Sequence, residues 1–182
     1  MHAQRHPVSE APWLTPEALE TVVTICASHQ RAFGRPLIAA AAPYGTLALT
    51  MAPETRLLAQ ELFATSTVVL AHDGADPSGD PGPRLVYANR SALQLWRRPW
   101  SALVGMPSRL TAAPKERASR ALALGNVQRQ HAISDYSGIR IDSQGRRFLI
   151  RGARVWTLWR QRGDENPEPC GQAAAFSDWH WL

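Results

Sequence analysis

Residues 86–111 constrain the fold of this chain more than any other part of the sequence. They read V-Y-A-N-R-S-A-L-Q-L-W-R-R-P-W-S-A-L-V-G-M-P-S-R-L-T. Asn89 follows a short apolar strand and is suited to cap a helix, because its side-chain oxygen can accept a hydrogen bond from a free amide of the first turn. Pro99 then ends that helix, and Gly105 ends the short turn that follows. A strand, a capped helix and a broken turn in so short a span predict a small mixed domain.

Strand signals lie on both sides of this stretch. Apolar and β-branched runs, bounded by Pro, Gly and Asp, predict strands at 66–71, 84–88, 136–142, 146–160 and 170–176. We expect the long strand to bend near Gly152. Helices are expected at 89–96, 100–104 and 114–125, with Gly125 ending the last. This order predicts an α+β fold, with one antiparallel five-stranded sheet and helices on one face.

The N-terminal third predicts a helical extension of that fold. A hydroxyl cap, a proline and an acid at 15–17 begin a helix, which continues to Phe33 and ends at Gly34. A second helix is expected at 53–63, after an ordered linker at 37–51. We therefore divide the chain into a flexible tail (1–14), a helical extension (15–64) and the core (65–182). The first helix is expected to cover the outer face of the sheet.

Seven short strings occur in order along the chain. They are S-H-Q-R-A-F-G-R-P-L (28–37), V-Y-A-N-R-S-A-L (86–93), P-S-R-L-T-A (107–112), G-I-R-I (138–141), G-R-R-F-L-I (145–150), V-W-T-L (155–158) and G-Q-A-A-A-F (171–176). Together they resemble the MEKHLA family, a PAS-related domain of bacterial proteins and of plant class III homeodomain–leucine zipper factors. The resemblance spans residues 21–182. It implies a PAS-like sheet and a role in sensing or dimerisation, without a known ligand. The loop at 76–83 is several residues longer than the family's spacing.

The charge of the chain is unevenly distributed. Residues 84–162 hold 16 Arg and Lys against 3 Asp and Glu, a net charge of +13, whereas 1–83 and 163–182 each carry −4. Such a basic segment can attract nucleic acid or another acidic partner. The alternative is that it packs beside the acidic flanks and leaves a solvated face. We favour this alternative and do not expect nucleic-acid binding.

Several classes of protein are excluded by what the sequence lacks. Two distant cysteines, Cys26 and Cys170, exclude a disulfide framework and a four-ligand zinc site. The absence of a long apolar run and of a secretory signal predicts no membrane span and a cytoplasmic location. Phosphate-binding, metalloprotease and paired-carboxylate motifs are missing, so we expect neither catalytic residues nor a metal. The cofactor stays unknown, since the flavin-adduct cysteine of light-sensing relatives is absent and His131 alone indicates haem weakly.

The candidate ligand site is a cavity between the sheet and the helices at 89–96 and 114–124. Its expected apolar walls are Trp96, Ile139, Ile141, Phe148, Ile150 and Trp156. We expect Arg109 at the rim as the polar anchor, because a guanidinium can hold a carboxylate or phosphate, although it can equally fix its own loop. Asn89 is foremost a helix cap and secondarily a group that orients a ligand. A fully packed core without room for a ligand is the alternative.

These expectations describe a non-enzymatic PAS-like sensory or protein-interaction module that binds a small ligand between sheet and helices. The alternative functions are an enzyme acting on a small anionic substrate near Arg109 and, less favoured, nucleic-acid binding through the basic segment 84–162. We expect no output domain on this chain, so that a signal would pass through association. We expect a homodimer formed by the first helix, the outer sheet face or both, since the apolar stripe at 19–33 and a second Trp-bearing sheet face need partners.

Overall fold

A computed structural model describes residues 10–41, 53–161, 163 and 165–182 of the chain. The first nine residues of the expected tail, and residues 42–51 of the expected linker, lie outside the described residues. The helices are α1 (Pro16–Phe33), α2 (Pro53–Ala64), α3 (Arg90–Trp96), α4 (Trp100–Leu103) and α5 (Arg117–Gln130). The strands are β1 (Val68–Asp73), β2 (Leu85–Ala88), β3 (Ala132–Ile141), β4 (Arg147–Arg160), β5 (Glu168–Phe176) and β6 (Asp178–Trp181).

All strand pairs in the sheet are antiparallel, in the order β2-β1-β5-β4-β3, and β6 also pairs with β4. The strand β6 continues β5 in the same register along β4, since Arg154 faces Ala175 and Arg151 faces Asp178. The predicted α+β, PAS-like antiparallel sheet is therefore confirmed. Its sixth strand is the far end of the fifth, resumed after Ser177.

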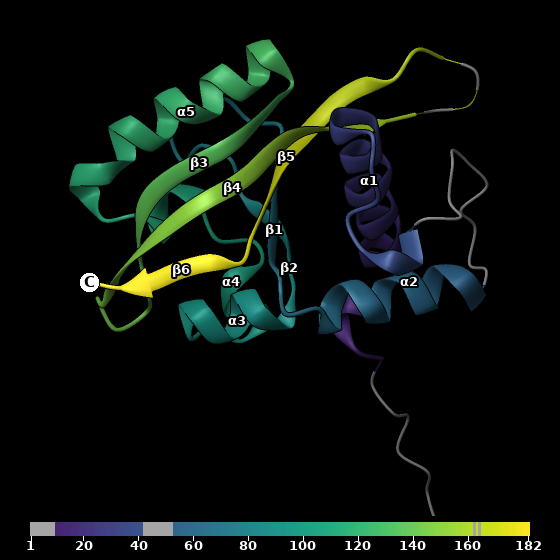
Figure 1. Cartoon of the computed structure of the whole chain (residues 1–182), viewed down its shortest axis with the longest axis horizontal. Coiled ribbons are helices and arrows are strands. Elements are labelled where there is room, and N and C mark those ends of the chain that lie inside the picture. Colours follow the sequence, from purple (N-terminus) through teal and green to yellow (C-terminus); the bar gives the residue numbers. More distant parts are fainter. Residues whose placement is uncertain (1–9, 42–52, 162, 164) are drawn as a thin grey trace, which may run out of the picture.

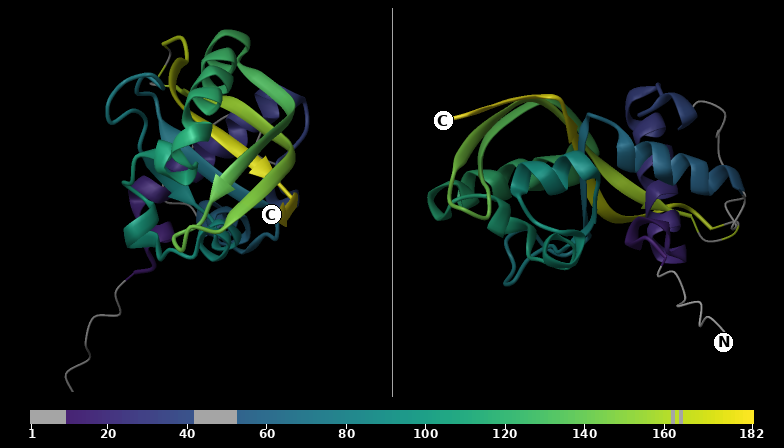
Figure 2. Two further views of the ribbon diagram at one scale, coloured as in Figure 1. Left: turned by 90° about the vertical axis from the view of Figure 1, so that its left-hand side faces the viewer. Right: turned by 90° about the horizontal axis from the view of Figure 1, so that it is seen from below.

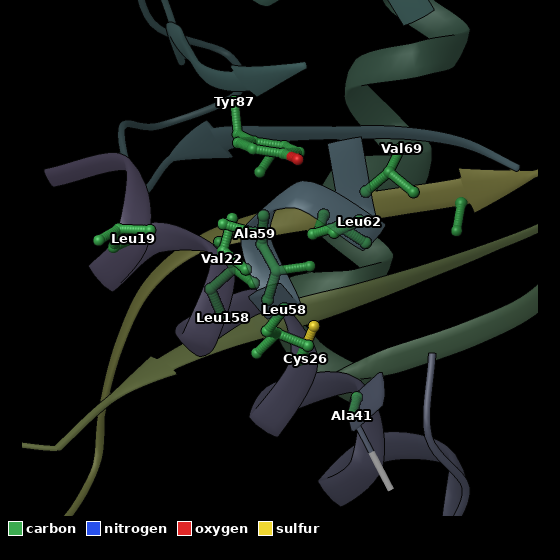
Figure 3. Packing of buried hydrophobic residues seen from close by; sticks show 14 of the residues in the cluster. Leu19, Val22, Cys26, Ala41, Leu58, Ala59, Leu62, Val69, Tyr87 and Leu158 are labelled. Carbon is green, nitrogen blue, oxygen red and sulfur yellow. The ribbon is translucent and has the colours of Figure 1, made fainter. Parts of the chain in front are cut away.

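Helices cover both faces of this sheet (Figures 1 and 2). The strands curve over α3, α4 and α5, and we call the face toward these helices the inner face. Helices α1 and α2 lie against the opposite, outer face. Figure 3 shows side chains of both N-terminal helices meeting Val69, Tyr87 and Leu158 of the sheet. The helical extension therefore covers the outer face, as the sequence predicts.

The capping residues of α1 act as the sequence indicates. The Thr15 hydroxyl oxygen accepts a hydrogen bond from the Ala18 amide at 3.3 Å. Gly34 ends the helix with φ of +66°, in the left-handed region that glycine adopts without strain. Between these ends Leu19, Val22 and Cys26 are buried against the sheet and α2. The apolar stripe of α1 is thus used within the chain.

Strand β4 changes the face to which its side chains point at Gly152. Phe148 and Ile150 pack on the inner face, whereas Trp156 packs on the outer face with α1. Unbroken alternation would place all three on one face. Gly152 has φ of +61°, and the register against β3 shifts by one residue beside it, which is the geometry of a β-bulge. The expected bend is present, but the prediction that Trp156 shares a face with Ile150 is wrong.

Two further boundaries differ from the sequence prediction. Helix α5 continues through Gly125 to Gln130, and His131 caps its end with φ of +65°. Glycine within a helix costs about 1 kcal/mol relative to alanine, and burial of Leu124 and Val127 outweighs that cost. Strand β3 consequently begins directly after His131, at Ala132, rather than at Tyr136.

Candidate functional site

A cavity of about 60 Å³ lies between α5 and the inner face of the sheet. Apolar side chains form most of its walls, among them Leu70, Leu124, Val127, Val155 and Phe176. A single water molecule needs about 10–15 Å³ of such space. The cavity therefore has room for roughly four to six non-hydrogen atoms. A flavin or a haem would require it to enlarge.

Four long polar side chains interrupt the apolar walls. They are His72 from β1, Arg120 from α5, Arg140 from β3 and Gln172 from β5. Each is at most 8% exposed. Because burying a polar group is unfavourable unless it is hydrogen-bonded, the partners of these four side chains decide what the cavity can hold.

His72 and Gln172 occupy facing positions on the neighbouring strands β1 and β5. The His72 Nδ1 lies 2.7 Å from the Asp73 carbonyl oxygen and donates to it, which leaves Nε2 as an acceptor. The Gln172 Nε2 donates to the Leu124 carbonyl at 2.9 Å. Among the described residues neither His72 Nε2 nor Gln172 Oε1 has a hydrogen-bond partner. The cavity wall thus presents two buried, unused acceptors.

Arg140 lies on the inner face of β3 with Tyr136, two alternations apart. Its guanidinium donates to the Tyr136 hydroxyl oxygen at 2.8 Å and to the carbonyl oxygen of Ile139 at 2.9 Å. Gly138 lies between them on the same face. A Cβ at Gly138 would come within 2.5 Å of the Tyr136 hydroxyl and 2.9 Å of an Arg140 nitrogen. The missing side chain at Gly138 therefore lets these two polar groups meet beside the cavity.

Arg120 projects from α5 and makes no hydrogen bond or ion pair among the described residues. Burial, reinforced by the positive charge of Arg140, lowers the pKa of its guanidinium to about 9. Burial and the Arg120 charge in turn lower the pKa of His72 to about 4, so this histidine is neutral near pH 7. The walls carry two buried arginines, and no acidic side chain is among the lining residues.

The structure separates the expected wall residues. Trp96 and Ile150 line the cavity. Phe148 packs on Trp96, with ring centroids 5.2 Å apart, but does not line the cavity. Ile139 and Ile141 alternate with Tyr136 and Arg140 along β3, so they point away from the cavity and are half-buried. Expecting the two isoleucines on the inner face is wrong, because the polar residues of β3 take that face.

Trp156 belongs to the opposite side of the sheet. Its ring is fully buried, and its Nε1 donates to the Ile25 carbonyl of α1 at 3.3 Å. The rings of His29 and Phe33 meet it edge-on, with centroids 4.9 and 6.0 Å away. Trp156 therefore joins α1 to the sheet, and the expectation that it forms a cavity wall is wrong.

Asn89 connects α3 to β1. Its Oδ1 accepts hydrogen bonds from the amides of Ala92 (3.1 Å) and Val69 (3.0 Å), and its Nδ2 donates to the Thr67 carbonyl at 2.7 Å. The predicted N-cap is confirmed. All these hydrogen bonds are made inside the chain, and Asn89 does not line the cavity. Its role is therefore structural: it holds the start of α3 against β1.

Arg109 lies at the surface, in the 3-10 turn Ser108–Thr111. Its guanidinium pairs with the Asp80 carboxylate at 2.8 Å, and both side chains are substantially exposed. It does not line the cavity. The partner comes from the long loop between β1 and β2, so the sequence could not show that Arg109 has a carboxylate inside its own chain.

The sequence alone does not place the four polar side chains at the cavity. Arg120 and Arg140 belong to the basic segment and were expected on a solvated face. The predicted strand ends at Ala71, one residue before His72, although His72 follows Leu70 at the spacing that places both on one strand face. That spacing was the one available signal. Nothing comparable marks Arg120, whose burial depends on where α5 packs.

The described residues contain neither a cluster of metal-ligating side chains nor a membrane-spanning helix. Among them, no group of three or more His, Cys, Asp or Glu side chains is placed to hold a metal ion. Within the same residues, no helix has both the length and the apolar character needed to cross a bilayer. His131 is exposed and packs against Trp159, away from the cavity.

Comparison with known proteins agrees with this architecture. A PAS domain from Colwellia psychrerythraea superposes with a TM-score of 0.52 at 10% identity, covering 66% of this chain and 92% of that one. An RNA-binding light-oxygen-voltage receptor gives 0.55 at 14% identity, covering 74% of this chain and 36% of that one. This chain thus spans about a third of that receptor. Comparison with curated proteins finds no match. The MEKHLA domain model matches residues 19–181, and the chain therefore belongs to the MEKHLA domain family, with a PAS-like fold.

Proposed function

We propose that this chain is a non-enzymatic sensory domain that binds a small molecule in the cavity between α5 and the inner face of the sheet. One observation carries the proposal: the cavity is lined by buried polar groups that lack partners within the described residues. Each buried group left without a hydrogen bond costs about 1–3 kcal/mol. Tyr87 and Thr157, away from the cavity, also lack partners among the described residues, but the groups at the cavity lie beside space that a molecule can occupy. A bound molecule would supply the missing hydrogen bonds.

The placement of α5 supports a sensory role for this site. The cavity contacts β1, β4 and β5 on one side and the side chains Ala123, Leu124 and Val127 of α5 on the other. Occupancy would therefore change how α5 packs on the sheet. Transmission by association with another protein is part of the proposal, and a cytoplasmic location remains an expectation.

The alternative function at Arg109 receives less support. Its guanidinium already has the Asp80 carboxylate as a partner, and it lies outside the cavity. The basic segment likewise uses several of its arginines internally. Asp142, for example, pairs with Arg146 at 2.9 Å and with Arg97 at 3.8 Å. These pairs favour the interpretation of the basic segment as a structural and solvated region.

A ligand screen with a cavity-filling variant tests the proposal. Wild-type protein and Ala123→Leu, which adds volume to the α5 wall, are unfolded thermally with a set of compounds small enough for the cavity. A ligand at a hundred times its dissociation constant should stabilise the wild type by about 2.7 kcal/mol, and the variant much less. If no compound stabilises the wild type, or if both proteins respond equally, binding does not occur in this cavity.

A further inference from the structure

The two arginines of the cavity are its most unusual feature. Arg120 and Arg140 are each 8% exposed and close enough for the charge of Arg140 to act on Arg120. Two buried like charges repel, and a buried charge without a partner is strongly unfavourable. Elsewhere in the described chain the buried Asp142 carboxylate is paired with arginine. At the cavity the opposite charge is the missing component.

A guanidinium selects the kind of anion. Its planar arrangement of donors matches the two oxygens of a carboxylate, or the oxygens of a phosphate, with parallel hydrogen bonds. Arg140 already donates two hydrogen bonds, to the Tyr136 hydroxyl and to the Ile139 carbonyl, and these fix the orientation of its guanidinium. Arg120 keeps all of its donors available among the described residues. The pair thus offers one fixed and one free cationic group.

The acceptors opposite the arginines add a second requirement. His72 Nε2 and Gln172 Oε1 can only accept hydrogen bonds in the arrangement found here. A carboxylate cannot serve them, since it too is an acceptor. A hydroxyl group on the same ligand can. The remaining walls are apolar and suit a short hydrocarbon portion.

From this arrangement we propose that the cavity binds a small hydroxycarboxylate, with its carboxylate between Arg120 and Arg140 and its hydroxyl group directed to His72 or Gln172. The volume of about 60 Å³ limits such a ligand to roughly four to six non-hydrogen atoms. Glycolate and lactate have the required size and groups. This inference rests on the proposed function, because it names the ligand class for the same cavity.

Isothermal titration of the full chain with four probes tests the ligand class. The probes are lactate, propionate without the hydroxyl, the neutral amide of lactate, and inorganic phosphate. We expect lactate to bind more tightly than propionate and at least tenfold more tightly than the amide. Equal binding of lactate and its amide would refute the anionic class while leaving ligand binding intact. Tighter binding of phosphate than of lactate would refute the carboxylate.

Variants of the arginines locate the site. Arg120→Met should weaken lactate at least tenfold, and Arg120→Lys should recover part of this loss because it restores the charge without the planar donors. Arg129→Met is the matched control, since Arg129 is exposed on the same helix. Wild-type affinity in the Arg120 variants would overturn the proposal.

The stability of the ligand-free protein provides a second readout. Removing an uncompensated buried charge should leave Arg120→Met at least as stable as the wild type, whereas loss of a structural arginine would destabilise it. A clear decrease in the unfolding midpoint of Arg120→Met would therefore contradict an anion-binding role. If lactate, its amide and phosphate all fail to bind, and if Ala123→Leu and the wild type respond equally in the thermal ligand screen, the proposed function itself fails.

Discussion

Replacing Trp156 with alanine tests how the helical extension is joined to the sheet. The side chain is fully buried between α1 and the outer face. Truncating a buried tryptophan or phenylalanine to alanine costs about 3–5 kcal/mol. The hydrogen bond from Nε1 to the Ile25 carbonyl and the edge contacts with His29 and Phe33 are lost as well. We therefore expect a loss of about 4–5 kcal/mol, in the upper half of that range.

Urea unfolding of Trp156→Ala and wild type measures this loss as a shift in midpoint at equal slope. Trp181→Ala is the matched control, because Trp181 is 41% exposed at the end of β6, and it should cost about 1 kcal/mol or less. Ligand affinity should be the same in Trp156→Ala and wild type, since the ring faces away from the cavity. A loss below about 1 kcal/mol, or a changed ligand affinity, would refute the assignment of Trp156 to the outer face.

Three further predictions concern the cap of α3, the protonation of His72 and the oligomeric state. Asn89→Ala leaves the buried backbone amides of Val69 and Ala92 without partners. We therefore expect urea unfolding to show a decrease of about 2–4 kcal/mol in the free energy of unfolding, and a decrease under about 1 kcal/mol would contradict the capping role. Burial lowers the pKa of His72 from 6.5 to about 4. Between these pH values the unfolded chain binds a proton on His72 that the folded chain does not, so the free energy of unfolding should fall as the pH drops from 6.5 to about 4. An equally steep fall in His72→Gln would exclude His72 as the cause. A homodimer remains a prediction, checked by sedimentation equilibrium, in which a single species of 20.1 kDa at high micromolar concentration would contradict it.

The fold could be predicted because its signals are local. The capping residues Thr15 and Asn89 and the terminating Gly34 act through neighbouring backbone groups, and each is found where the sequence indicates. The order of strands and helices then leaves few arrangements for one antiparallel sheet. The apolar stripe of α1 is likewise a local signal, and it predicted that this helix covers the outer face of the sheet.

The candidate site could not be predicted as fully, because it depends on which face each side chain takes. A single bulge at Gly152 reverses the alternation of β4 and moves Trp156 from the expected inner face to the outer one. On β3 the polar residue Arg140, rather than Ile139 or Ile141, points inward. Hydrophobicity alone favours the opposite orientation, and the tertiary position of Arg120 has no local signature.

The central claim is that the inner cavity binds a small hydroxycarboxylate at Arg120 and Arg140. The most direct measurement is a titration of the full chain with lactate, followed by NMR correlation spectra of its backbone amides. We predict that the amides of α5, together with those near His72 and Gln172, shift first and saturate together. Shifts confined to the exposed Arg109–Asp80 pair, or spread over the basic segment without saturation, would contradict the claim.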